Sequence, residues 1–251
     1  MTMISVMDLK ATMNSNTNFE NDPFGHAIHD YISGNETPDI LVRSELCEDD
    51  IMPVSLLFRS YEEMPEPEKI ALSKCRGHIL DVGAGSGCHS FWLIENDFEV
   101  DAIELSKGAV DYHLSKGLKS RYVSFFDLKD ERYDTLLFLM NGIGIGGMLN
   151  RLEETLTQAH KLLNDNGKVI CDSSDLKYLY EDDEGGYWIN LNVEYYGEYD
   201  YQMQYKNTVS EWFKWLYVDF DTLKNYAEKT GFEIVKLYDE DNHYLAELIK
   251  K

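Results

Sequence analysis

Three alternate glycines, Gly83, Gly85 and Gly87, close the run His-Ile-Leu-Asp-Val-Gly-Ala-Gly-Ser-Gly at residues 78–87. Glycines have no Cβ atom, so they let the chain turn sharply after a strand and let its backbone come close to a ligand. A second apolar segment ends in Glu104, and one carboxylate can accept hydrogen bonds from the two adjacent hydroxyls of a ribose. The pattern predicts a nucleotide-like cofactor held at the end of a parallel sheet.

The glycine spacing separates two classes of cofactor. A dinucleotide-binding loop reads G-x-G-x-x-G, whereas here the last glycine comes one residue early and Cys88 follows it. The spacing therefore argues against a nicotinamide oxidoreductase. The stretch resembles the first motif of class I S-adenosylmethionine-dependent methyltransferases, an acidic residue, an apolar residue and then G-x-G-x-G, which Asp81, Val82 and the three glycines match. A glycine-rich turn without a ligand is the alternative.

The elements that must position these residues follow from the hydrophobic pattern. From residue 78 onward, strand patterns alternate with helical patterns, which indicates an α/β fold with an open parallel sheet. Strands are expected at 78–83, 98–104, 121–126, 133–140 and 167–173, helices near 87–96, 107–117, 149–163 and 219–230, and final strands at 232–239 and 243–249. The last two strands are joined by a short turn and must be antiparallel. The resemblance implies a seven-stranded Rossmann-like methyltransferase sheet with an antiparallel last strand.

Two segments lie outside this alternation. Residues 1–76 are expected to form a loose arm followed by a helical lid, with helices near 24–31, 53–61 and 66–75. The rest, 77–251, would be the methyltransferase domain. Within it, residues 175–218 are rich in Tyr and Trp, with partial alternation over 187–195, 199–205 and 211–218, which predicts a β insertion after the fifth strand. The insertion would cap the acceptor pocket, or else pack as a peripheral layer or dimer surface.

The charge balance limits the partners. The chain has 251 residues, of which 46 are acidic and 23 basic, giving a formal net charge of −23. Nucleic-acid and anionic-membrane binding rest largely on Lys and Arg, so both partners are disfavoured. We expect a small-molecule or peptide acceptor, and a monomer or homodimer.

The cysteines and the N-terminal residues bear on the compartment. The four cysteines, Cys47, Cys75, Cys88 and Cys171, include no C-x-x-C pair, and reduced thiols are expected. The first residues lack a basic start followed by a long apolar run, and no segment approaches the length of a membrane span. A cytoplasmic protein is predicted, and no group of His and Cys at metal-ligand spacing is present in the sequence.

The resemblance assigns roles at the carboxyl ends of the strands. Glu104 would bind the ribose hydroxyls, Asp127 would accept a hydrogen bond from the adenine amino group or else cap a turn, and Phe126 or Leu128 would pack on the ring. Asp81 would hold the glycine loop or face the methionine amino group. Arg59 would bind the cofactor carboxylate or else form a surface salt bridge. The predicted cofactor-binding residues are Arg59, Asp81, Gly83, Ala84, Gly85, Gly87, Glu104, Leu105, Phe126, Asp127, Asn141 and Gly142.

The acceptor site is expected after the fourth and fifth strands. Asn141 begins Asn-Gly-Ile, where relatives that methylate nucleic-acid bases carry Asn or Asp, Pro-Pro and an aromatic residue. Asp172 and Asp175 could orient or deprotonate an acceptor, or cap a turn. Asn141 and Asp172 are the predicted catalytic residues. His26, His29 and His243 are possible bases without a located partner, and His89 is expected at the cofactor's periphery.

The resemblance implies a methyltransferase that uses S-adenosylmethionine, releases S-adenosylhomocysteine and moves the methyl group by in-line displacement. A non-catalytic binding or scaffold protein with the same fold is the alternative.

Overall fold

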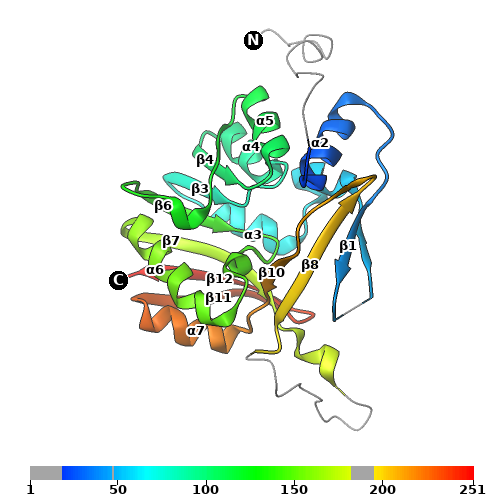
Figure 1. Ribbon diagram of the computed structural model, residues 1–251. Helices are drawn as coiled ribbons and strands as arrows, with labels where there is room; N and C mark the ends of the chain where they lie inside the picture. The colour runs from blue at the N-terminus through cyan, green and yellow to red at the C-terminus, as the bar shows by residue number, and fades with distance from the viewer. Residues whose placement is uncertain (1–18, 47, 182–194) are drawn as a thin grey trace.

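A seven-stranded sheet forms the centre of the molecule (Figure 1). The computed structural model describes residues 19–46, 48–181 and 195–251. In spatial order the strands are β11 (Phe232–Glu240), β12 (His243–Lys250), β7 (Leu163–Ser174), β6 (Tyr133–Phe138), β3 (His78–Val82), β4 (Glu99–Glu104) and β5 (Lys119–Tyr122). β3 pairs in parallel with β4 and β6, and β12 is antiparallel to both β7 and β11. The predicted Rossmann-like methyltransferase sheet with an antiparallel last strand is confirmed.

Alternate residues of the central strands belong to two hydrophobic layers, one on each face of the sheet. Leu80 and Leu136 belong to the layer under α6 (Leu152–Leu162) and α7 (Phe220–Lys229). Their neighbours Ile79 and Leu137 belong to the layer under α3 (Glu66–Lys74) and α4 (Cys88–Glu95). Because both faces are covered, most residues of β3 and β6 are buried, as expected for central parallel strands. No helix in the described part of the chain is long and apolar enough to cross a membrane.

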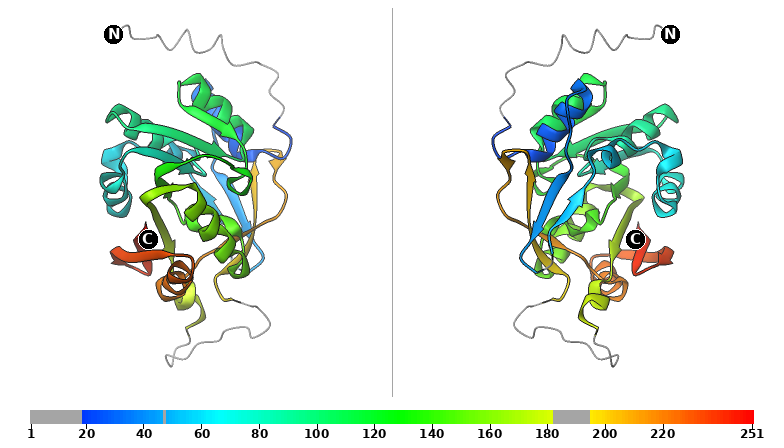
Figure 2. Two further views of the ribbon diagram at one scale, coloured as in Figure 1. Left: turned by 90° about the vertical axis from the view of Figure 1, so that its left-hand side faces the viewer. Right: turned by 90° about the vertical axis from the view of Figure 1, so that its right-hand side faces the viewer.

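A second sheet joins the N-terminal segment to the aromatic insertion. β8 (Glu198–Tyr205) pairs antiparallel with β10 (Phe213–Leu216), β9 (Thr208–Val209) and β1 (Ile40–Ser44), and β1 pairs with β2 (Asp50–Met52). Figures 1 and 2 show β1 and β8 side by side along one flank of the larger sheet. Strands over 199–205 and 211–218 were expected. The N-terminal segment, expected to form an arm and a helical lid, contains α2 and α3 but also the strands β1 and β2, which were not predicted. β1 pairs with β8, which lies more than 150 residues away in the sequence, so this pairing leaves no local signal.

Two further expectations need correction. The helix expected over 53–61 is two 3₁₀ turns, Val54–Phe58 and Tyr61–Glu63, because Arg59 and Ser60 between them are extended. The strand expected at 121–126 ends at Tyr122, since the Ser124 hydroxyl accepts a bond from the Phe126 amide and starts a 3₁₀ turn. Residues 187–194 of the third expected insertion strand lie outside the described residues.

The helix α2 (Pro23–Ser33) packs across α5 (Lys107–Ser115) at a pair of glycines. Asp22 caps both helices: its Oδ1 accepts from the Gly25 amide at 2.8 Å, and its Oδ2 accepts from the Gly108 amide at 3.0 Å. A Cβ atom on Gly108 would lie 2.6 Å from the Gly25 Cα. The two backbones therefore meet with no room for a side chain, which fixes α2 beside the start of α5.

Substitution of Gly108 by valine is expected to lower the free energy of unfolding by about 2 kcal/mol or more, because the new Cβ overlaps backbone atoms that cannot move independently. Urea unfolding followed by circular dichroism measures the change. Lys107→Val is the matched control, since it places the same β-branched residue at the neighbouring exposed position. Equal unfolding midpoints for the two variants would contradict the close packing of α2 on α5.

Candidate functional site

The glycine loop leaves β3 at the carboxyl edge of the large sheet. Gly83, Gly85 and Gly87 have φ angles of 70°, 61° and 87°, a left-handed conformation that glycine adopts without strain. A Cβ atom on Gly83 would meet no described atom within 4 Å, and one on Gly85 would meet only Phe24 Cζ, at 3.7 Å. The loop backbone is thus open on one side and can be approached closely by a ligand.

Glu104 ends β4 and organises this loop. Its Oε2 accepts from the Gly85 amide at 2.9 Å, and its Oε1 accepts from the Leu105 and Ser106 amides at 2.6 and 3.1 Å. Burial raises the pKa of the Glu104 carboxyl, and these hydrogen bonds oppose that rise. Each carboxylate oxygen can accept more than one bond, so Glu104 can also receive ligand hydroxyls. Beside it, the Leu105 side chain is 64% exposed and offers an apolar surface.

Asp81 lies beneath the loop. Its Oδ2 accepts from the Ser90 hydroxyl of α4 at 2.6 Å, and its side chain is buried. Burial raises the pKa of the Asp81 carboxyl, while His89 and the Ser90 bond act in the opposite direction. Ala84 is buried next to it in the loop. Asp81 therefore ties the glycine loop to the first turn of α4, as one of its two predicted roles requires.

Asp127 and Phe126 follow β5 in a 3₁₀ turn. Asp127 is exposed, and no side-chain bond from its carboxylate to another described residue is present, so it can accept from a ligand. The Phe126 ring instead lies under the Arg151 guanidinium, 4.5 Å from its centroid, and faces α6. Leu128 is buried in the core. Packing of Phe126 on an adenine ring stays a prediction.

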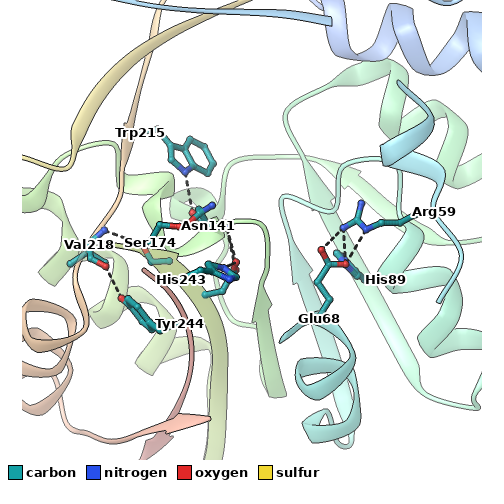
Figure 3. A network of polar contacts seen from close by, with 11 residues as sticks. Arg59, Glu68, His89, Asn141, Ser174, Trp215, Val218, His243 and Tyr244 are labelled. Carbon is teal, nitrogen blue, oxygen red and sulfur yellow. Dashed lines mark hydrogen bonds and ion pairs between the residues drawn. The ribbon is translucent and has the colours of Figure 1, made fainter. Parts of the chain in front are cut away.

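Arg59 is buried in a cluster with Glu68 of α3 and His89 of α4 (Figure 3). Its Nε and Nη2 donate to the Glu68 carboxylate at 3.0 and 2.7 Å, and His89 Nε2 lies 2.8 Å from Glu68 Oε2. Burial favours a high pKa for Glu68, but the hydrogen bonds from His89 and Arg59 hold it below its usual value. Nη1 donates to the Leu56 carbonyl at 2.7 Å.

Replacement of Arg59 by methionine is expected to cost about 3 kcal/mol of unfolding free energy, because Glu68 would remain buried without its cation. The double variant Arg59→Met/Glu68→Met should recover most of this loss, since it removes both charges. Urea unfolding of the two variants tests the expectation, and equal instability would refute it. The folded double variant then reports on Arg59 as a ligand: weaker S-adenosylhomocysteine binding is expected if Arg59 holds the cofactor carboxylate.

Asn141 sits in a strained turn at the end of β6. Met140 and Asn141 have φ angles of 61° and 59°, which non-glycine residues rarely adopt, although Asn tolerates them best. The backbone N–H of Asn141 donates to both carboxylate oxygens of Asp172, each at 3.1 Å. The side-chain Oδ1 of Asn141 accepts from the Ser174 hydroxyl at 2.9 Å. The Trp215 indole N–H of β10 donates to the Asn141 carbonyl at 3.0 Å. The ends of β6 and β7 are thus joined to the second sheet, and Gly142 begins the buried 3₁₀ turn that follows.

His243 stands next to Asp172 at the same edge, because β12 runs antiparallel and begins where β7 ends. Its Nε2 lies 2.7 Å from Asp172 Oδ2. The hydrogen bond with Asp172 raises the pKa of His243, and burial partly opposes the rise. The two predicted catalytic residues, Asn141 and Asp172, are therefore brought together, and the structure adds His243 as the partner of Asp172. His26, by contrast, lies in α2 beside Thr208 of β9.

Tyrosine hydroxyls of the insertion meet carboxylates near the same edge. Tyr196 donates to Asp175 Oδ1 at 2.7 Å, and Tyr195 donates to Asp219, the N-cap of α7. Burial raises the pKa of Tyr195, so its hydroxyl stays protonated. The Asp175 carboxylate thus accepts from the Tyr196 hydroxyl and from the Lys177 amide of the turn that it caps. This agrees with the alternative in which Asp175 caps a turn. Tyr187 and Trp188 lie outside the described residues.

Sequence patterns identified the loop and strand-end residues but missed several partners. Asp22, Phe24, Glu68 and Trp215 reach the site only through tertiary contacts, and nothing in their local sequence signals it. Among the described residues no group of His, Cys, Asp and Glu could hold a metal ion. The described cysteines Cys75, Cys88 and Cys171 are free thiols.

Comparison with known proteins supplies relatives of this arrangement. No protein-family model and no curated protein matches the chain. A crystal structure of a SAM-dependent methyltransferase from Bacteroides fragilis in complex with S-adenosyl-L-homocysteine is 39% identical, with a TM-score of 0.86 over 94% of this chain and 98% of that one. Two structures similar in fold alone are the sugar N-methyltransferase KedS8 from a Streptoalloteichus species (14% identity, TM-score 0.54, 80% and 93% coverage) and the CcbJ methyltransferase from Streptomyces caelestis (15%, 0.56, 76% and 94%).

Proposed function

The chain belongs to the S-adenosylmethionine-dependent methyltransferases, and from this premise we propose that it transfers the methyl group of its cofactor to a small-molecule or peptide acceptor by in-line displacement. The cofactor is S-adenosylmethionine. The observation that carries the proposal is the bare glycine loop beside Glu104: the open space at Gly83 and the remaining acceptor capacity of the carboxylate fit a ribose and the chain attached to it.

Each predicted ligand residue then has a physical task. Glu104 accepts from the ribose hydroxyls, and the exposed carboxylate of Asp127 accepts from the adenine amino group. The exposed side chain of Leu105 covers one face of the adenine. Arg59 binds the carboxylate at the other end of the cofactor. When bound, the cofactor supplies an electrophilic methyl group, and the protein's contribution is mainly to hold the acceptor in line with it.

We place the acceptor beside Asn141, Gly142 and Asp172. These residues lie at the carboxyl edge of the sheet, where ligands bind in such folds. The Trp215 indole N–H of the second sheet donates a hydrogen bond to the Asn141 carbonyl. The second sheet, with its tyrosines and Trp215, would cap the acceptor. The net charge of −23 favours an uncharged or cationic acceptor over nucleic acid. The proposed division of the chain is residues 1–76, the arm and lid, and residues 77–251, the methyltransferase domain. The two parts share the second sheet, because β1 pairs with β8.

Calorimetry and a turnover assay test the proposal together. In calorimetry, the protein is expected to bind S-adenosylhomocysteine in a one-to-one ratio. In the turnover assay, it is expected to convert S-adenosylmethionine to S-adenosylhomocysteine when it is given acceptors from a panel of amines, hydroxyl compounds and short peptides. Absence of binding would refute the proposal. Binding without turnover across the panel would favour a non-catalytic binding or scaffold protein.

A further inference from the structure

The contact between His243 and Asp172 has the form of an oriented base. Asp172 is 6% exposed in its side chain and His243 is 30% exposed, and the two side chains meet at 2.7 Å. A carboxylate can only accept a hydrogen bond, so Nε2 of His243 must carry the proton of this bond. In the neutral imidazole Nδ1 then holds the free lone pair, and it has no partner among the described residues. His243 is thus held in one tautomer with a basic nitrogen left over.

The same carboxylate also binds the turn that is expected to border the acceptor. Both oxygens of Asp172 accept from the backbone N–H of Asn141. Asn141 also accepts hydrogen bonds from the Ser174 hydroxyl and from the Trp215 indole N–H. Figure 3 shows His243, Asn141 and Ser174 gathered around these bonds. His243 is therefore linked to the end of β6 through the Asp172 carboxylate, which both residues share.

The charged groups around His243 all favour proton uptake. Asp172 of β7 is the nearest, Glu68 of α3 acts from a greater distance, and Glu240 of β11 is its register partner across the hairpin. Asp172 and Glu68 stabilise the imidazolium form, which a base must reach after it has taken a proton.

We propose that His243 is the general base of the reaction and that Asp172 is its positioning residue, so that the acceptor is attacked through an N–H or O–H group. The inference rests on the proposed methyl transfer and narrows its substrate class. The acceptor nitrogen or oxygen forms a bond to the methyl carbon, and the carbon–sulfur bond breaks with its electron pair remaining on sulfur. The acceptor's proton passes to Nδ1 of His243, and the resulting imidazolium is paired with Asp172. Acceptors that attack through a proton-free carboxylate are excluded.

Nuclear magnetic resonance of the histidine side chains locates the base without an acceptor. The titration of His243, assigned by comparison with His243→Gln, is followed in the full-length protein saturated with S-adenosylhomocysteine and then with S-adenosylmethionine. Only the second ligand carries a positive charge on sulfur, so it should lower the pKa of His243 by about one unit relative to the first if the imidazole faces the reacting methyl group. Equal pKa values with the two ligands would overturn the inference.

His78 provides the matched control. It is also half-buried, with an imidazole nitrogen 3.5 Å from Asp101, but it lies at the start of β3, at the opposite edge of the sheet. Its resonances should be the same with both ligands. In Asp172→Asn the pKa of His243 should fall, because the carboxylate that stabilises the imidazolium is gone. An unchanged pKa in that variant would remove Asp172 from its positioning role.

Turnover separates a base from a structural residue. For an acceptor that the wild-type protein methylates, His243→Gln should lower kcat at neutral pH by about a hundredfold. The loss should shrink as the pH rises, since the acceptor then loses its proton to solvent. An unchanged kcat, or a loss that is the same at every pH, would contradict the proposal. If no S-adenosylhomocysteine binds at all, the methyltransferase function fails instead, which calorimetry distinguishes.

Discussion

Substitution of Gly83 by leucine is expected to abolish binding of S-adenosylhomocysteine while the protein remains folded. Gly83 has a φ of 70°, and a Cβ there would point into space that no described atom fills. The new side chain would occupy the volume in which we place the cofactor, and binding should weaken by about a thousandfold or more, because the backbone can no longer approach the ligand. Isothermal titration calorimetry measures the loss.

Gly117→Leu controls for backbone strain. Gly117 has a φ of 83° and also has nothing within 4 Å of its Cβ position, but it follows α5 and precedes β5, at the other edge of the sheet. Both variants carry the cost of a left-handed leucine, about 1 to 2 kcal/mol. Only Gly83→Leu should lose the ligand. If both variants bind S-adenosylhomocysteine as the wild type does, the cofactor does not lie on the glycine loop.

Removal of the Glu104 carboxylate by Glu104→Ala should weaken S-adenosylhomocysteine binding by about a thousandfold. The substitution removes the charged acceptor for two ribose hydroxyls, and such bonds are stronger than neutral ones. It also leaves the Gly85, Leu105 and Ser106 amides without their common partner, so the glycine loop should lose its shape. The same calorimetric titration measures the effect.

Glu99→Ala is the matched control for this strand. Glu99 begins β4, whereas Glu104 ends it, and its side chain is 74% exposed. Both substitutions remove one negative charge from the same strand, so a difference between them reports on position and not on net charge. A Glu99→Ala variant that lost binding to the same degree would show that the effect is a general one of charge.

Local sequence was sufficient for the glycine loop and for the order of the strands in the large sheet. Gly83, Gly85 and Gly87 adopt the left-handed conformation that only glycine takes freely, and Glu104 is close to them along a predictable strand. The carboxyl ends of β3, β4, β6 and β7 could be predicted to within about two residues, because an apolar strand pattern is visible within a few consecutive residues. The antiparallel ending followed from the short turn at 239–242, since neighbouring strands joined by so few residues have one possible pairing.

The partners of these residues could not be predicted because they come from distant parts of the chain. Arg59 was a candidate, but its carboxylate partner Glu68 lies on another element. The 3₁₀ turns at 54–63 depend on the extended Arg59 and Ser60 and on the contacts that hold them. β1 obtains its strand hydrogen bonds from β2 and from the distant β8. Short segments of this kind have no stable conformation of their own.

The sequence by itself determined the fold class, the glycine loop and the strand ends that lie beside it, because each rests on backbone conformation and on periodicity over a few residues. Only the tertiary structure decided which groups face each other there. The join between Asn141 and Trp215, the double cap made by Asp22, and the contact between Asp172 and His243 each require the chain to close on itself. The proton-transfer step that we propose depends on the last of these contacts.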